Sequence, residues 1–594
     1  MDPEAIKRRR QQQPECSYLS DWQTYSAGIV ATSIHNLICG MESGPLYIPM
    51  PTGSGKTTGA IWGILDVLED YPDKRICFLT PYKKSVDSVF SALLEHLGPE
   101  VVGHYHSDAT IFDKAEELAR QVVVLTHSFI PYNKGKLDDR DLFIVDEAIY
   151  STGEATLKLQ HFAAARSWAT SNNIMPDEFG AAYEYAHAMD VELRETDKKF
   201  IAPQNHNELV WAKCIANDFK SEVYRQKIPQ DNNVDRVQIF CEALCEGLVF
   251  LAKGATGNDN YDPFYSAAVL GIPNLQNTAV LSATGGMLYD IAGSFKQDSS
   301  SKNDWKPPSF EHLTLVQLPN PDIHGQYSSW SHPTSRSQAI RYVDWLLSQI
   351  PEAQVYLTVP NQVLVQALSS YFGLPQRGEI ELPTIVEKHG KTIHLSHHSL
   401  SIGSNDFKDC DAVIYLWDND LPQSVSVQRF HTLADEPVTD EQLEDANNRY
   451  LVGDYRRIRE AQYLDNMMQQ IGRGTVRNID NQGNVGTMSA YVLTKQPNRF
   501  VSLTAQYREC QVSCLEGYKA VTQPKGTVAR IIQYLGRCER GQDIPAAQVQ
   551  EALNIQIRKL KSDLENDWDL MMLGYEYKPG SKGRGHSAVF KWTG

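Results

Sequence analysis

The sequence predicts an α/β protein, and three patterns along the chain predict this fold class. The run YIPMPTGSGKTT at 47–58 passes from a strand pattern into a glycine-rich turn, and an apolar helix pattern follows at 59–68. A second series of strand and helix patterns begins beyond the polar segment 296–311. Strands of open α/β sheets end in polar side chains where the sheet binds a ligand. Three more apolar runs end in this way: 75–80, 122–125 and 142–145.

Composition and charge are those of a globular protein with several domains. The chain has 594 residues, 22% of them charged, and a formal net charge of −17. At the usual domain size this length holds about three to five domains. The acidic balance excludes a protein coated in basic surface, although one local cationic cleft would be enough to hold a nucleic acid.

Cysteine usage and hydropathy predict a soluble intracellular protein without membrane contact, in the cytoplasm or nucleoid or in a nucleus. The ten cysteines contain no C-x-x-C pair, which indicates neither a zinc ribbon nor a disulfide framework. No apolar stretch is long enough to span a bilayer, and the charged N-terminus lacks the apolar core of a signal peptide. Residues 1–20 are expected to form a basic, solvated tail, and the alternative is that Lys7 to Arg10 form a nucleic-acid-binding arm or a nuclear signal.

The glycine-rich turn has the pattern of a phosphate-binding loop. Gly53 and Gly55 permit the backbone to curl around an anion, Lys56 would reach the β- and γ-phosphates of ATP, and Thr57 would contact Mg²⁺. The loop departs from the usual pattern at Met50, where a small residue is expected. Further upstream, Gln23 either contacts an adenine ring or is an ordinary surface residue. The predicted cofactor-binding residues are Gln23, Thr52, Gly53, Ser54, Gly55, Lys56, Thr57 and Thr58.

Two adjacent carboxylates follow the apolar run 142–145. Hydrolysis of a nucleoside triphosphate needs one carboxylate to hold Mg²⁺ and another group to orient the attacking water. Asp146 is predicted to hold Mg²⁺, and Glu147 is predicted to orient the attacking water.

Six short motifs occur along the chain in the order PTGSGKT, FLTPYKK, VVVLTHS, VDEA, LSATGG and QQIGRGTVR. They are similar to motifs I, Ia, Ic, II, III and VI of superfamily 2 helicases of the DEAD/DEAH-like kind, which the chain resembles from about residue 21 to 494. The resemblance implies two RecA-like domains with ATP bound between them and a nucleic-acid strand across their tops.

The resemblance also implies roles for single residues. Gln469 and Arg473 would complete the catalytic site, with Arg473 stabilising charge on the γ-phosphate. The second arginine of the motif is Arg477, one position later than the family pattern places it, at Val476. The nucleic-acid contacts implied in the two domains are Thr80, Lys83, Thr126, His127 and Asn405.

The spacing of the motifs predicts the domain organisation. The first RecA-like domain spans 21–150 and is completed by 249–295, around a largely helical insertion at 151–248 that looks like the arch of the XPD/DinG branch. That branch usually carries an iron–sulfur cluster, but Cys77 is the one cysteine between Lys56 and Asp146, so no such cluster can form there. The chain is therefore either a DinG-like protein without the cluster or another helicase with an unrelated insertion. The remaining units are a linker at 296–311, a second RecA-like domain at 312–505 with an acidic surface excursion at 418–450, and a winged-helix-like domain at 525–594.

The winged-helix-like domain is predicted from three helix patterns and two alternating strands around a basic turn, whose Lys582 and Arg584 would contact DNA. The whole pattern predicts an ATP-dependent helicase or translocase that uses ATP and Mg²⁺, and it favours single-stranded or forked DNA over RNA. Two alternatives remain. One is an RNA helicase whose insertion and tail recruit protein partners. The other is an ATP-gated DNA-binding scaffold that does not unwind.

Overall fold

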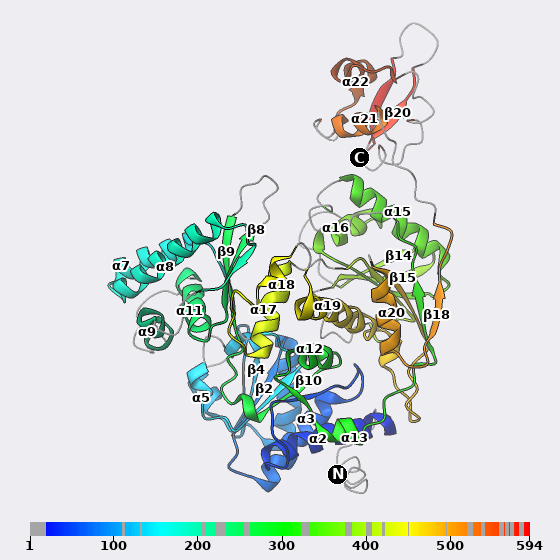
Figure 1. Ribbon diagram of the computed structural model, residues 1–594. Coiled ribbons are helices and arrows are strands. Elements are labelled where there is room, and N and C mark those ends of the chain that lie inside the picture. Colours follow the sequence, from blue (N-terminus) through cyan, green and yellow to red (C-terminus); the bar gives the residue numbers. More distant parts are fainter. Residues whose placement is uncertain are drawn as a thin grey trace.

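The structure is a computed structural model with two α/β bodies, an insertion beside the first and a small C-terminal unit set apart from both (Figure 1). It describes residues 19–109, 113–130, 134–151, 153–203, 209–219, 232–254, 262–321, 330, 333–374, 383–398, 407–418, 422–448, 451–494, 496–518, 527–535, 538, 541–557, 564, 570, 575–580 and 587–593. Within these ranges no helix is both long and apolar enough to cross a membrane.

The first body is a seven-stranded sheet in which every pairing is parallel, in the order β11-β1-β10-β5-β2-β4-β3. Its central strands are buried apolar runs, as parallel strands covered on both faces must be. The strands are β1 (Leu46–Ile48), β2 (Ile76–Thr80), β3 (Val102–Tyr105), β4 (Val122–Thr126), β5 (Leu142–Asp146), β10 (Thr278–Leu281) and β11 (Lys296–Gln297). The helices are α2 (Asp21–Ile38), α3 (Lys56–Asp70), α4 (Lys83–Leu97), α5 (Lys114–Ala119), α12 (Gly285–Ala292) and α13 (Ser299–Asn303).

The insertion contains a sheet that the helical prediction missed. Its four strands are antiparallel, in the order β6-β9-β8-β7, and its helices pack against them around a core of their own. The predicted boundary at 248 is wrong, because 249–254 and 262–269 form two strands of this sheet, and the second of them pairs with β6 instead of completing the first body. The strands are β6 (Gly153–Leu157), β7 (Phe200–Ile201), β8 (Val249–Gly254) and β9 (Asp262–Val269). The helices are α7 (Leu159–Asn172), α8 (Pro176–Glu195), α9 (Val210–Asp218) and α11 (Asn232–Cys245).

The second body is again a seven-stranded sheet, in the order β14-β15-β13-β16-β17-β12-β18, and β14 alone pairs antiparallel. Its edge strand β18 lies beyond the predicted limit at 505, so the domain continues to 514. The strands are β12 (Leu313–Gln317), β13 (Gln354–Val359), β14 (Thr384–Lys388), β15 (Lys391–His397), β16 (Ala412–Leu416), β17 (Met488–Leu493) and β18 (Gln511–Cys514). The helices are α15 (Pro333–Gln349), α16 (Gln362–Tyr371), α19 (Gly453–Ile471) and α20 (Pro497–Gln506). Both bodies are therefore parallel-sheet, RecA-like cores.

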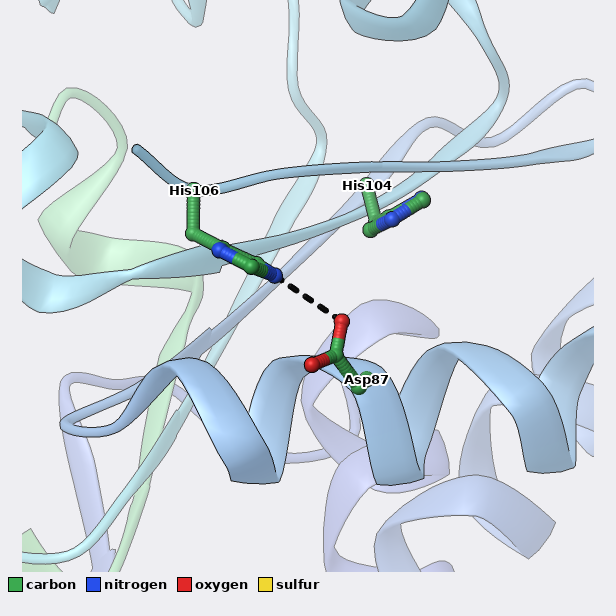
Figure 2. A group of neighbouring side chains, drawn as sticks. All are labelled: Asp87, His104 and His106. Atoms are coloured by element: carbon green, nitrogen blue, oxygen red, sulfur yellow. Dashed lines mark hydrogen bonds and ion pairs between the residues drawn. The ribbon is translucent and has the colours of Figure 1, made fainter. Parts of the chain in front are cut away.

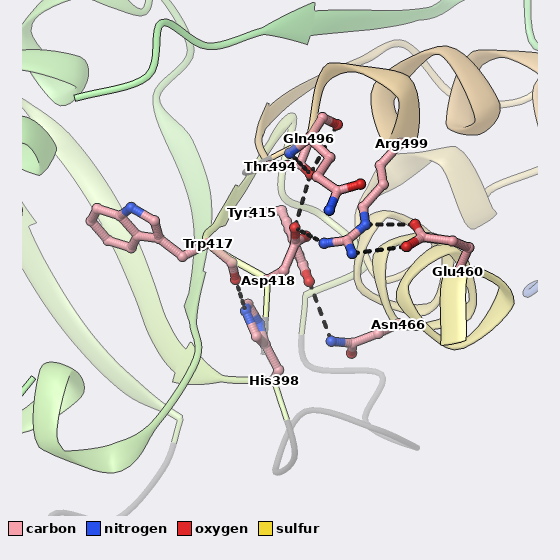
Figure 3. Close-up of polar contacts among 9 residues, drawn as sticks. All are labelled: His398, Tyr415, Trp417, Asp418, Glu460, Asn466, Thr494, Gln496 and Arg499. Atoms are coloured by element: carbon pink, nitrogen blue, oxygen red, sulfur yellow. Dashed lines mark hydrogen bonds and ion pairs between the residues drawn. The ribbon is translucent and has the colours of Figure 1, made fainter. Parts of the chain in front are cut away.

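A buried ion-pair network fixes two helices to the strand ends of the second sheet (Figure 3). The Arg499 guanidinium donates to Asp418 at 2.6 Å and to both oxygens of Glu460, at 2.7 and 3.1 Å. Asp418 is fully buried and also accepts from the Thr494 hydroxyl at 2.9 Å. The guanidinium lies 3.5 Å from the ring centroid of Tyr463. Because every charge in this group is paired and hydrogen-bonded, the network ties α19 and α20 to the end of β16.

The acidic segment 418–450 is not a surface excursion, which corrects the prediction. It forms α17 (Gln423–Ala434) and α18 (Glu444–Asn447), which share a hydrophobic cluster with the insertion. The Asn447 amide bonds both backbone groups of Phe200 on β7, at 2.8 and 3.0 Å. Gln428 donates to the Ala267 carbonyl on β9 at 2.8 Å. The second body therefore holds the insertion directly.

The predicted linker at 296–311 begins inside the first body. β11 pairs with β1, and α13 packs on α2. Asp298 is buried, accepts from the Ser301 amide at 2.9 Å and bonds the Ser33 hydroxyl. Asp298 caps α13, and Ser300 and Ser301 on that helix are buried. Only 304–312 crosses between the sheets.

The C-terminal unit contains α21 (Thr527–Leu535), α22 (Ala546–Leu553) and a three-stranded sheet in the order β19-β21-β20. The strands are β19 (Ile544–Pro545), β20 (Tyr575–Lys578) and β21 (Val589–Trp592), and the unit has its own apolar core. Most of the predicted third helix at 555–564, and the basic turn with Lys582 and Arg584, lie outside the described residues.

Candidate functional site

The phosphate-binding loop joins β1 to α3 as the sequence predicts. Gly53 and Gly55 have φ of 85° and 82°, in the left-handed region that favours glycine. No side chain caps α3 at Gly55, so its first amides are available to an anion. Met50 is fully buried in the core of the first body, which explains why an apolar residue stands at this position of the motif.

Lys56 lies inside the loop that precedes it. Its Nζ donates to the carbonyls of Met50 and Pro51, at 2.9 and 3.1 Å. Burial lowers the pKa of Lys56, while the carboxylates of Glu147 and Asp146 act in the opposite direction. When a nucleotide binds, the Lys56 ammonium could therefore donate to phosphate oxygens in place of these two carbonyls.

Thr57 and Asp146 form an oxygen pair suited to a small hard cation. The Thr57 hydroxyl donates to Asp146 Oδ2 at 3.2 Å. Burial, and then the charge of Glu147, raises the pKa of Asp146 to about 6. Mg²⁺ prefers one or two protein oxygens together with substrate phosphates and water, so these two groups fit it.

Glu147 is held in an uncommon backbone conformation. Its φ is 69°, which is strained for a residue with a side chain, and its amide donates to the Leu281 carbonyl on β10 at 2.8 Å. On the other side, Gln469 of α19 donates to Glu147 Oε2 at 3.3 Å. The second body therefore touches the carboxylate at the end of the first sheet.

Asp465 is a member of the site that sequence reasoning missed. It accepts hydrogen bonds from the hydroxyls of Thr284 and Tyr150, the latter at 2.5 Å, and from Gln469 Nε2 at 3.4 Å. Burial raises the pKa of Asp465, which its hydrogen-bond donors oppose. One signal was present in the sequence: Asp465 precedes Gln469 by one helical turn, so the two share a face of α19.

The two arginines of the last motif lie against the phosphate-binding loop. A Cβ added to Gly53 would come within 2.2 Å of the Arg477 carbonyl. Arg473 is 3% exposed, and both arginines lower the pKa of Lys56. Burial, with the charge of Arg473, lowers the pKa of Arg477 to about 10. Val476 is buried in the core of the second body, which accounts for the displaced second arginine.

Gln23 supports the loop in this structure. Its Nε2 donates to the Gly53 carbonyl at 2.7 Å, and its Oε1 accepts from the Ser20 amide at 2.9 Å. The second contact belongs to the capping box at the start of α2.

A cavity of about 470 Å³ lies between the two bodies and reaches the loop at Thr52. Trp305 comes from the connection between the bodies, Gly472 from the last motif, and Phe310 and Tyr507 add aromatic rings. Arg508, Lys302 and Gln506 provide its polar part. Its volume lies within the range usual for small-molecule sites.

The predicted nucleic-acid contacts lie at the ends of neighbouring strands. Thr80 and Thr126 are register partners on β2 and β4, and the Thr80 hydroxyl is buried without a hydrogen bond to any described residue. Lys83 is exposed and pairs with Asp108 at 2.8 Å. Burial lowers the pKa of His127 to about 4, so the imidazole is neutral near neutral pH. Asn405, like Lys582 and Arg584, lies outside the described residues.

Residues 30–161 match the family model described as DEAD/DEAH box helicase. A search of curated protein sequences finds no match. Among solved structures, an XPD helicase is similar with 14% identity and a TM-score of 0.46, over 84% of this chain and 100% of that one. S. cerevisiae Dbp5 bound to RNA and ADP BeF3 is similar with 12% identity and a TM-score of 0.35, over 87% and 94%.

A third similar structure is the DUF1998 helicase MrfA bound to DNA and AMPPNP, with 11% identity and a TM-score of 0.34. The match covers 95% of this chain and 59% of MrfA. The family model spans the phosphate-binding loop, the carboxylates Asp146 and Glu147 at the end of β5 and the strands between them. Proteins with such a domain use ATP and Mg²⁺. Residues 30–161 are a DEAD/DEAH box helicase domain, and this domain makes the chain an ATP hydrolase.

Proposed function

We propose that the chain is an ATP-dependent helicase or translocase that acts on DNA, with ATP hydrolysed between the two RecA-like bodies. The observation that supports this best is the contact between Gln469 and Glu147, at 3.3 Å. It joins the last motif of the second body to the water-orienting carboxylate of the first. Hydrolysis in a site shared by two bodies can change how they sit on a strand.

Each residue of the shared site has a role in this proposal. Lys56 and the amides of the loop bind the β- and γ-phosphates, Thr57 and Asp146 hold Mg²⁺, and Glu147 orients the attacking water. Bound Mg²⁺ supplies charge neutralisation at the phosphates. Arg473 and Arg477 stabilise the charge that develops on the γ-phosphate.

The cavity beside Thr52 is the proposed site of the nucleoside. It continues from the loop toward Trp305, Phe310 and Tyr507, whose rings offer stacking surfaces to a planar base. In this arrangement Gln23 supports the phosphate-binding loop through its hydrogen bond to Gly53. The aromatic residues that line the cavity contact the base and select it.

The strand-binding surface is proposed at the ends of β2 and β4, with Thr80, Lys83, Thr126 and His127. Asn405, in the sequence of the second body, is proposed as a further contact. DNA is favoured over RNA because the insertion at 153–269 and the winged-helix-like order of the C-terminal unit are expected to hold a forked duplex. Lys582 and Arg584 would contact its backbone. The insertion and the C-terminal unit are also proposed as surfaces for protein partners.

Steady-state ATP hydrolysis, measured without nucleic acid and with single-stranded DNA, single-stranded RNA or duplex, tests the proposal. Stimulation by single-stranded DNA, with unwinding of a forked DNA, is the expected result. Stimulation by RNA alone would favour the RNA helicase alternative. Hydrolysis that ignores all three, without unwinding, would favour the ATP-gated scaffold.

A further inference from the structure

Three side chains of metal-ligand type lie close together (Figure 2) at edge strand β3 of the first sheet, which the sheet order separates from β1 and the phosphate-binding loop. They are Asp87 on α4, His104 on β3 and His106 just after that strand, and one ligand atom of each lies within 4.8 Å of the others. His104 and His106 are two positions apart in extended chain, which puts both on the face of β3 that meets α4.

The cluster is buried at His106 and open to solvent at Asp87. His106 is buried, with a side chain 6% exposed, and its Nε2 lies 2.9 Å from Asp87 Oδ1. The Asp87 carboxylate is 56% exposed, so an ion could enter and keep water ligands on that side. His104 stacks on Phe90 with ring centroids 3.9 Å apart, which fixes its ring plane.

A second carboxylate supports His104 from outside the cluster. Glu117 Oε2 accepts from the His104 amide at 3.0 Å and lies 3.9 Å from its Nδ1. That Nδ1 is buried and makes no hydrogen bond to any described residue. Metal-binding histidines commonly face a carboxylate with the ring nitrogen that does not bind the metal, and this partner orients the ring.

The hydrogen bonds of His106 show which of its ring nitrogens faces the cluster. His106 Nδ1 accepts from the Asp108 amide at a long 3.3 Å, which leaves the ring proton on Nε2 in the metal-free chain. Coordination through Nε2 moves that proton to Nδ1, at the cost of this weak bond.

We propose that Asp87, His104 and His106 bind one divalent transition-metal ion of the zinc class. Two imidazoles and one carboxylate leave coordination positions for water and favour Zn²⁺ or its neighbours over Mg²⁺ or Ca²⁺, which prefer all-oxygen sites. By binding Asp87 and His104 together, the ion links α4, the helix that begins at Lys83, to edge strand β3. It acts as a structural brace beside the proposed strand-binding surface and takes no part in ATP hydrolysis.

Metal binding by the full chain tests the proposal without any activity assay. The protein is stripped with a chelator, and Zn²⁺ affinity is measured by competition with a chromophoric chelator, with Co²⁺ as the spectroscopic probe. We expect one equivalent bound, and a loss of at least about tenfold in affinity for His104→Ala and for His106→Ala. Glu117→Gln should weaken binding less than either. His96→Ala is the matched control, because His96 is an exposed imidazole on α4, the helix that carries Asp87. This variant should bind Zn²⁺ as tightly as the parent.

Two results would overturn the proposal. One is a parent protein that binds neither Zn²⁺ nor Co²⁺. The other is a His104→Ala/His106→Ala double variant that binds as tightly as the parent, which would place the ion elsewhere. Asp87→Asn keeps a hydrogen-bond acceptor for His106, so it separates loss of a ligand from loss of folding. It should melt like the metal-free parent and lose the melting-temperature increase that Zn²⁺ gives the parent.

Discussion

Asp465, on a helix of the second RecA-like body, accepts a hydrogen bond from the Thr284 hydroxyl of the first. The same carboxylate accepts from Tyr150, three residues after Glu147, and from Gln469, which itself contacts Glu147. One partly buried acceptor therefore joins three motifs across the boundary between the bodies. A shift of either body by more than a hydrogen-bond length would break at least one of these contacts.

Asp465→Asn is expected to lower kcat for ATP hydrolysis by about tenfold or more and to leave KM for ATP nearly unchanged. The new amide presents a donor where the carboxylate accepted, so Gln469 and Glu147 lose their alignment while the phosphate-binding loop stays intact. Misaligning a catalytic group by about 1 Å can cost on this order or more. Tyr150→Phe removes a single hydrogen bond and should show a smaller loss. A rise in KM with kcat intact would contradict this positioning role.

Glu147→Gln is expected to keep ATP binding and to lower turnover by about 10²-fold or more, because the amide cannot act as a general base. Equilibrium binding of a labelled nucleotide and steady-state hydrolysis together measure the two effects. Glu95→Gln, an exposed position on α4, should change neither. Normal hydrolysis by the Glu147 variant would assign the water to another residue.

Stability in the absence of nucleotide and metal should depend on pH through Asp146. Its pKa rises from 3.8 to about 6 in the folded chain, so between these values the native state binds more protons than the unfolded state. Stability therefore falls as pH rises from about 4 to about 6 and is level above that range. Asp146→Asn should remove this dependence and raise the melting temperature most above pH 6. Asp73→Asn, at an exposed site, should leave the profile as in the parent.

Arg499→Met is expected to destabilise the second body by about 3–5 kcal/mol, because it leaves the fully buried Asp418 without its cation. Denaturant unfolding measures the loss, and adding Asp418→Asn should recover part of it. Arg457 offers a matched exposed pair with Asp454 at 2.7 Å, with side chains 63% and 48% exposed. Arg457→Met should cost no more than about 0.5 kcal/mol. An equal loss in the free energy of unfolding for Arg499→Met and Arg457→Met would show that the buried network adds no more stability than an exposed ion pair.

Trp305→Ala is expected to raise KM for ATP several-fold without lowering kcat, if the cavity beside Thr52 holds the base as proposed. Removing a stacking surface costs about 1 kcal/mol, which corresponds to a factor of about five. Trp305→Phe keeps an aromatic ring and should restore most of the affinity. Unchanged KM in both variants would place the base outside this cavity.

The local signals in the sequence were sufficient for strands β1, β2, β4 and β5 of the first sheet, whereas β3 was not predicted and β11 lies in the predicted linker. Each apolar run that ends in a polar residue becomes a parallel strand, and Gly53, Gly55, Asp146 and Glu147 stand at such strand ends. Asn405, Lys582 and Arg584 stay predictions, as do the individual roles of the catalytic residues.

Non-local pairing accounts for what sequence reasoning missed. The strands at 249–254 and 262–269 are apolar runs like those of the first body, and only their antiparallel register with β6 assigns them to the insertion. The polar segment around Asp298 resembles a linker until its carboxylate is seen capping α13. The acidic segment at 418–450 resembles a surface loop until Asn447 is seen on the edge of β7.

The sequence by itself determined the order of the motifs, the curled phosphate-binding loop and the carboxylates that follow a buried strand, because each depends on residues near one another in the chain. Only the tertiary structure decided that Asp465 meets Thr284 and Tyr150, and that Asp87 meets His104 and His106. These contacts join residues on separate elements, and their positions follow from how sheets and helices pack, which local periodicity does not encode.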